Sequence, residues 1–116
     1  MNISILGTDY KYTEHSPGSF EFENFDGFCQ PLDKEIHVKK KEYLGVSSDS
    51  TKYERYKHII THELIHAFME ESGRGYDVDE FLVDWIATML PKINNVLDNI
   101  LNNYNDSNEE SNDKQS

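Results

Sequence analysis

Cysteine is nearly absent from this chain. The 116 residues include one, Cys29, so no disulfide can form within a single copy. A lone thiol fits a reducing compartment such as the cytoplasm, where disulfides rarely persist. We interpret Cys29 as a small buried apolar residue rather than a nucleophile, because no arrangement of His and Asp in the sequence points to it.

Positive charge is also scarce. Eleven Lys and Arg stand against 22 Asp and Glu, which leaves a formal net charge of −11. Nonspecific binding to DNA or RNA needs Lys and Arg to displace the counterions of the phosphates, so the composition argues against a nucleic-acid partner. The one basic run, Lys39–Lys41, is interpreted as the solvated end of a strand.

Long apolar runs are missing as well. No stretch approaches the ~20 apolar residues of a membrane-spanning helix, so no membrane partner is expected. The N-terminal run Ile3–Leu6 is too short for a signal peptide and lacks a basic start. We therefore expect one cytoplasmic domain with a modest core over residues 1–104. Residues 105–116, rich in Asn, Ser, Asp and Glu, are predicted to form a disordered acidic tail.

The most informative motif is His62-Glu63-Leu64-Ile65-His66. Two histidines four residues apart lie on one face of a helix, one turn apart, where both can bind a single metal ion. Glu63 follows His62 by about 100° around the helix, which places its carboxylate beside such an ion rather than on it. From there the carboxylate can take a proton from a water molecule that the metal binds.

The surroundings of this motif favour a buried site. The alternative interpretation is an amphipathic helix whose histidines are only polar surface groups. Apolar residues, however, surround the motif: Ile59, Ile60, Leu64, Ile65, Ala67 and Phe68. Burying an unpaired polar group costs about 2–7 kcal/mol, so His62 and His66 need partners, which a metal supplies. His58 lies one turn earlier on the same face. Three interpretations of it stay open: a fourth ligand, a substrate-binding group or a surface histidine.

A third ligand has to come from the carboxylates that follow. No histidine occurs after His66, which excludes the metallopeptidase classes that use a third His. Glu70 and Glu71 follow too soon on the same helix to reach the metal. From Asp77 onward, an apolar stripe predicts a second helix. Its members are Val78, Phe81, Leu82, Trp85, Ile86 and Met89.

In that second helix, Glu80 is predicted to complete a His-His-Glu site. Its fourth position stays open for water, as in catalytic rather than structural zinc sites. Asp84, one turn later, suits an acceptor that holds a ligand histidine in its metal-binding tautomer. Two alternatives stay open: Asp84 is itself the ligand, or Glu80 belongs to a capping box whose N-cap is Asp77.

These motifs resemble those of a known family. Residues 62–68, 80–84 and 87–91 are similar to the motifs of the small ImmA/IrrE-like metallopeptidases of phages, prophages and mobile elements. The resemblance covers roughly residues 55–93, and the family resembles the wider gluzincin group.

The resemblance implies a role for each motif residue. The implied zinc ligands are His62, His66 and Glu80. Glu63 would be the general base, and Asp84 would orient a ligand histidine. The resemblance also implies a protein or peptide substrate, with a regulatory protein as one candidate.

The expected fold is α+β, a minimal zincin-like domain. A small N-terminal antiparallel sheet is expected to pack on the motif helix and on the helix of Glu80. The predicted strands are 2–6, 9–14, 27–31 and 35–38, the last two as a hairpin. Asp49 or Ser50 is expected to cap the motif helix, and Gly73 and Gly75 to end it.

After Pro91 a third amphipathic helix is predicted, and its apolar side is expected to pack on the domain. The apolar residues are Ile93, Val96, Leu97, Ile100, Leu101 and Tyr104.

The function favoured by the sequence is a zinc-dependent metallopeptidase. The main alternative is a zinc-binding regulatory protein of a phage or prophage that has lost turnover, and a second is an interaction protein without metal. Glu63 argues against the first alternative, because a purely structural site has no use for a base. Tyr43 and Tyr76 are candidates for stabilising the developing oxyanion, among seven tyrosines.

Overall fold

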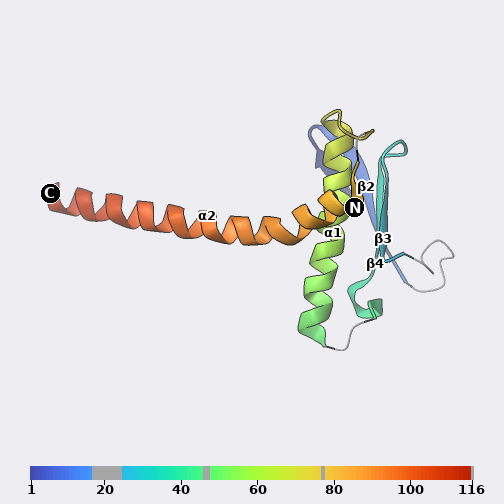
Figure 1. The fold of residues 1–116 in the computed structure, drawn as a ribbon, viewed down its shortest axis with the longest axis horizontal. Coiled ribbons are helices and arrows are strands. Elements are labelled where there is room, and N and C mark those ends of the chain that lie inside the picture. Colours follow the sequence, from blue (N-terminus) through green and yellow to red (C-terminus); the bar gives the residue numbers. More distant parts are fainter. Residues whose placement is uncertain (17–24, 46–47, 77, 116) are drawn as a thin grey trace.

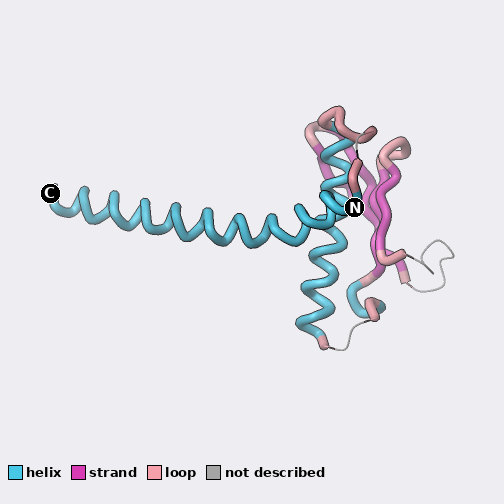
Figure 2. The backbone as a smooth tube through the Cα atoms, viewed as in Figure 1, coloured by secondary structure: helices cyan, strands magenta, loops and turns pink. Residues whose placement is uncertain are grey.

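The fold is α+β, as expected. A computed structural model describes residues 1–16, 25–45, 48–76 and 78–115, and of Asp49 and 105–115 it describes the backbone alone. The four strands are β1 (Asn2–Ile5), β2 (Thr8–His15), β3 (Gly27–Gln30) and β4 (Glu35–Lys39). A 3₁₀ turn, η2 (Lys41–Tyr43), leads to the helices α1 (Asp49–Glu71) and α2 (Glu80–Gln115) (Figures 1 and 2).

The sheet is mixed, which corrects the expected antiparallel sheet. Its strand order is β1-β2-β4-β3. Two antiparallel hairpins, β1–β2 and β3–β4, join through β2 and β4, which run parallel with Tyr12 opposite Ile36. Both hairpins are local, and the second was predicted, but the direction in which two hairpins join is decided by tertiary packing and has no local sequence signal. In the β1–β2 turn, Leu6 and Gly7 both have positive φ, the geometry that fits the twist of a two-residue hairpin.

The core lies between the sheet and α1, which crosses one face of the sheet (Figure 1). Tyr10 from β2 and Ile36 and Val38 from β4 are fully buried, and Ile59 and Ala67 of α1 pack against this cluster. Alternate residues of a strand point to one face, so Ile36 and Val38 both face the helix. This packing fixes which side of α1 is left to face away from the sheet.

The ends of α1 differ slightly from the expectation. Ser48 is the N-cap, rather than Asp49 or Ser50, and its hydroxyl accepts a hydrogen bond from the backbone N–H of Thr51 at 3.2 Å. The helix ends at Glu71, and Gly73 follows with φ +86°, the left-handed conformation that glycine supplies at helix ends.

The start of α2 is fixed by Asp79. Its carboxylate accepts a hydrogen bond from the backbone N–H of Phe81 at 2.9 Å. Asp77, the N-cap of the predicted capping box, lies outside the described residues. Where α2 crosses α1, Val83 and Ala87 are the buried members among the described side chains of α2.

The later part of α2 bears on three expectations. Pro91 lies inside one continuous helix, so the prediction of a separate third helix is wrong. Proline removes one backbone hydrogen bond, and here the neighbouring turns carry the helix past it. The α2 backbone also continues through Gln115, and the predicted disorder of residues 105–116 stays a prediction.

The third expectation concerned packing. The helix projects from the domain (Figure 1), and the radius of gyration is 18.6 Å against about 13 Å for a compact chain of this length. The apolar side chains from Ile93 to Tyr104 are exposed rather than packed on the domain. Neither helix, over the described residues, has the apolar length that a bilayer crossing requires.

Shortening Val83, the larger of the two buried side chains among those described in α2, tests this anchoring. Val83→Ala should lower the free energy of unfolding by about 2 kcal/mol, because it leaves a cavity at the crossing of α1 and α2. Val96→Ala, the same substitution on the exposed part of the helix, should stay within about 0.5 kcal/mol of the parent chain. Urea denaturation at low protein concentration measures both, and equal effects would contradict the assigned anchor.

Candidate metal centre

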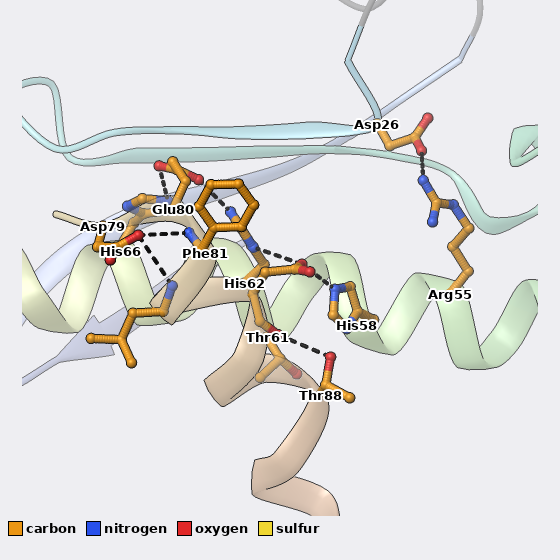
Figure 3. A network of polar contacts seen from close by, with 12 residues as sticks. Asp26, Arg55, His58, Thr61, His62, His66, Asp79, Glu80, Phe81 and Thr88 are labelled. Carbon is orange, nitrogen blue, oxygen red and sulfur yellow. Dashed lines mark hydrogen bonds and ion pairs between the residues drawn. The ribbon is translucent and has the colours of Figure 1, made fainter.

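The side of α1 that faces α2 carries all the predicted histidines. Because His58, His62 and His66 recur every four residues, they line one face of the helix, with the start of α2 lying across them (Figure 3). The imidazole centres of His62 and His66 are 5.0 Å apart. Burial of Ile59 and Ala67 against the sheet directs the histidine face away from the sheet.

Glu80 brings the predicted three-residue group together. One of its carboxylate oxygens lies 3.2 Å from Nε2 of His62, and the other lies 3.0 Å from Nε2 of His66 (Figure 3). Glu80 is the first residue of α2, so the Asp79 cap and the Val83 anchor together hold its carboxylate at this position.

Asp84 bridges two histidines rather than serving one. Its Oδ1 lies 2.8 Å from Nε2 of His58 and 3.6 Å from Nδ1 of His62. The hydrogen bond with His58 is the main cause that lowers the pKa of Asp84. The shorter contact of Asp84 is with His58, whereas the prediction was that it would orient a ligand histidine, and His62 lies slightly farther away. The ligand atoms of these three residues all lie within 4.8 Å of one another.

Glu63 is the buried charged residue of the site. Its side chain and backbone are 6% exposed. Burial raises the pKa of its carboxyl to about 7, and the negative charge of Glu80 acts in the same direction. Its carboxylate lies within 4.8 Å of ligand atoms of His62 and His66. A carboxyl with a pKa near neutrality is suited to exchange protons with a substrate or a water molecule.

The donor set fits zinc. Two imidazole nitrogens and a carboxylate oxygen are ligands that zinc commonly takes, with bonds of 2.0–2.2 Å. Two ligands of a tetrahedral ion at such bond lengths lie about 3.4 Å apart. The distances from Glu80 to His62 and to His66, 3.2 and 3.0 Å, are close to this spacing. A bound cation would also offset the repulsion between Glu80 and the buried Glu63.

A cleft of about 330 Å³ opens beside these residues. Its lining residues are Phe25, Asp26, Gly27, Arg55, His58, Ile59, His62, Glu63 and Asp84. The structure thus places the general-base candidate, Glu63, on the wall of a cleft. Neither Tyr43 nor Tyr76 is among these lining residues, so neither is placed as an oxyanion donor within the part of the chain that the structure describes.

Arg55 was missed by the sequence reasoning. Its guanidinium donates a hydrogen bond to Asp26 at 2.6 Å across the cleft wall (Figure 3). Burial tends to raise the pKa of Asp26, but hydrogen bonds from Arg55 and Lys39 outweigh it and lower that pKa. The available signal was the spacing, since Arg55 precedes His62 by two helical turns and so shares its face.

Comparisons with known proteins identify no family for this chain, because no family model, no curated protein and no solved structure matches it. The resemblance to ImmA/IrrE-like metallopeptidases therefore stays a prediction that rests on the motifs.

The buried carboxyl of Glu63 predicts a pH-dependent stability for the metal-free protein. Its pKa is about 7 in the folded chain against an ordinary 4.5, so the folded state binds more protons between these values. The contribution of the Glu63 carboxyl to the free energy of unfolding is fully present at low pH and is lost as the pH rises towards 7.

Glu63→Gln removes that dependence. In the presence of a chelator, the quantity of interest is the change in the free energy of unfolding that this substitution causes relative to the parent chain. That change should favour the folded state more at about pH 8 than at about pH 5, by up to roughly 3 kcal/mol. Urea denaturation of both proteins at both pH values measures these free energies. Subtracting the parent from the variant at each pH cancels the contributions of other titrating groups, because both proteins share them. An equal effect of the substitution at both pH values would show that Glu63 is ionised in the folded protein.

Proposed function

We propose that the chain is a zinc-dependent metallopeptidase. The observation that carries the proposal is the position of Glu63, a buried carboxyl with a raised pKa, beside His62, His66 and Glu80 at the wall of a cleft. Burying a carboxyl is unfavourable for folding, and a site that only holds a metal gains nothing from it. A hydrolase gains a proton acceptor.

His62, His66 and Glu80 would hold the zinc. When bound, zinc lowers the pKa of a water molecule in its open position towards ~7 and polarises a carbonyl group. The two imidazoles are directed by the packing of α1, and the Nδ1 side of His62 faces Asp84. A carboxylate behind a ligand histidine favours the tautomer whose other nitrogen binds the metal.

The chain's own residues then account for the proton transfers. Glu63, in its ionised form, accepts a proton from the water molecule as the oxygen attacks the peptide carbonyl carbon. It returns that proton to the amide nitrogen as the C–N bond breaks, which releases an amine and a carboxylic acid. The acid then loses its remaining proton to the solvent. Glu63 ends the cycle ionised and ready for the next water molecule.

An extended polypeptide fits the surroundings of the cleft. β3 is an edge strand, so one side of its backbone can pair with an added strand. Gly27, the first residue of β3, lines the cleft, and a Cβ there would lie 2.8 Å from Ile59 and 3.2 Å from a backbone oxygen. Glycine thus lets the strand approach α1 closely, and it leaves the strand edge beside Glu63 and His62. An edge of this kind favours a peptide substrate.

Zinc binding should depend on Glu80 and not on Glu63. We expect one zinc per chain by elemental analysis, retained in Glu63→Gln and strongly weakened in Glu80→Ala. Asp84→Ala should lose about 10–100-fold in affinity, which is typical of a residue that orients a ligand. The matched control is Glu54→Ala, which should bind zinc as the parent does. It removes an exposed α1 carboxylate that is paired only with Lys57 among its described contacts. Zinc lost from Glu63→Gln, or kept in Glu80→Ala, would reverse the assignment.

Hydrolysis should depend on Glu63. A library of peptides, incubated with the zinc-loaded chain and read by mass spectrometry, should show cleavage products. Glu63→Gln should reduce their rate by about 10²–10⁴-fold, because it removes the general base while leaving the zinc in place. Cleavage that survives in Glu63→Gln would rule out this mechanism. Zinc binding without any cleavage would favour the regulatory zinc-binding protein instead.

A further inference from the structure

A long row of exposed apolar side chains lies on α2, mostly beyond the part that contacts α1. Large apolar side chains recur along it: Leu90, Ile93, Val96, Leu97, Ile100, Leu101 and Tyr104. They are 40–62% exposed. A groove of about 420 Å³ runs along Ile93, Val96, Leu97 and Ile100. We refer to the seven side chains as the α2 stripe. Single exposed apolar residues are ordinary on proteins, but a continuous row of this length marks an interaction site.

The spacing of the α2 stripe is that of a coiled coil. Leu90, Leu97 and Tyr104 are seven residues apart, and Ile93 and Ile100 fall three residues after the first two. This alternation of three and four residues is the a/d pattern by which two helices interlock their side chains. A pattern that repeats along one helix is complementary to a second copy of itself.

Most of the α2 stripe lies beyond the place where α2 crosses α1. At 100° per residue, Ile93 and Ile100 lie on roughly the opposite side of the helix from Ala87, which is buried at the crossing. Leu90 and Leu97 lie on the side of the buried Val83, but there the helix already projects from the domain (Figure 1). A second helix can therefore approach the stripe without displacing α1. The start of α2, with Glu80 and Asp84, stays in its place.

The charge pattern permits self-association at this place. The chain as a whole has a net charge of −11, which opposes contact between copies. Residues 90–104 hold one base, Lys92, and one acid, Asp98, and are formally neutral. The coiled-coil positions that flank the a/d row are Asn94, Val96, Leu101 and Asn103, none of which is charged. Low positive charge also disfavours a membrane surface, which attracts helices rich in Lys and Arg.

The size of the α2 stripe is sufficient for a dimer. From their exposed fractions of 40–62%, its seven side chains expose on the order of 700 Å², close to the ≈800 Å² that each partner contributes to an interface of standard size. We propose that two copies of this chain associate through the α2 stripe as an antiparallel pair of helices.

Charge decides the orientation. A parallel pair would bring two acidic domains together at one end and two acidic tails, each with four acids and one Lys in 105–116, at the other. In an antiparallel pair centred near Asn95, the domains lie at opposite ends. Each a residue then meets a d residue: Leu97 of one copy faces Ile93 of the other, and Leu90 faces Ile100.

Sedimentation of the purified full-length chain tests the association. The parent chain should form dimers in the micromolar range at physiological ionic strength. Ile93→Gln with Ile100→Gln should weaken dimerisation by more than ~100-fold, because apolar burial is lost in both copies. Asn95→Gln with Asn102→Gln, on the opposite side of the helix, is the matched control and should dimerise as the parent does. Circular dichroism verifies that each variant keeps its helices.

A chain that stays monomeric throughout the micromolar range would overturn the proposal. A dimer that survives the double Ile substitution would also overturn it, since the contact would then lie elsewhere. Both results are independent of zinc and of hydrolysis, so they do not bear on the proposed function.

Disulfide crosslinking tests the orientation. In the antiparallel pair Val96 lies next to its own counterpart, so Val96→Cys should crosslink, because a disulfide needs Cα atoms within about 7 Å. The two copies of Tyr104→Cys would be about 27 Å apart along the axis and should not crosslink. Burial raises the pKa of Cys29 to about 12, so the native thiol should not react, and the parent chain is the control. Crosslinking at 104 would indicate a parallel pair and overturn the antiparallel arrangement.

Discussion

The contact of the Glu80 carboxylate with His62 and His66 is the interaction on which the rest of the site depends. Two imidazoles on a largely buried helix face need polar partners, because an unpaired polar group in an apolar environment is unfavourable. Glu80 supplies one oxygen to each. The contact exists only because α2 crosses α1 at this point, and Val83 and Ala87 are buried there. The small side chain of Ala87 lets the two helices approach closely enough for a carboxylate to reach both rings.

The electrostatics of the site favour a cation. Burial raises the pKa of Glu63, and the nearby negative charge of Glu80 adds to this effect. Asp84 adds a third carboxylate one turn along α2, paired with His58. A divalent ion between the imidazoles and Glu80 would stabilise the ionised form of Glu63, which is the form that accepts a proton. The proposed metal binding and the proposed general-base chemistry would therefore support each other in this arrangement.

The helix α2 has two parts with different surroundings. Its first two turns belong to the domain, because they contribute Glu80 and Asp84 to the site and Val83 to the contact with α1. Beyond Pro91 the same helix exposes an apolar row to solvent. If two copies pair through that row, the two proposed metal sites stay separate, since each is completed by residues of one chain. The pairing would stiffen α2 and so steady the helix from which Glu80 projects.

Local geometry was predictable from the sequence, and tertiary contacts were not. Spacing along a helix is fixed by its 3.6-residue repeat, so His62, His66 and the flanking Glu63 could be placed on their faces from the sequence alone. The β1–β2 and β3–β4 hairpins likewise follow from short-range turns. The parallel pairing of β2 with β4, the bridging of His58 by Asp84, and the approach of Arg55 to the cleft depend on segments that are distant in the sequence.

The apolar residues after Pro91 show the same division. The sequence by itself determined that Ile93, Leu97 and Ile100 share one side of a helix, because side-chain direction follows from the helical repeat. It also determined that this side must avoid water, because burial of apolar surface is favourable. Only the tertiary structure decided that α2 continues through Pro91 and leads this side away from the domain. The physical reason is that hydrophobicity is non-directional: it requires a partner surface but does not specify which one.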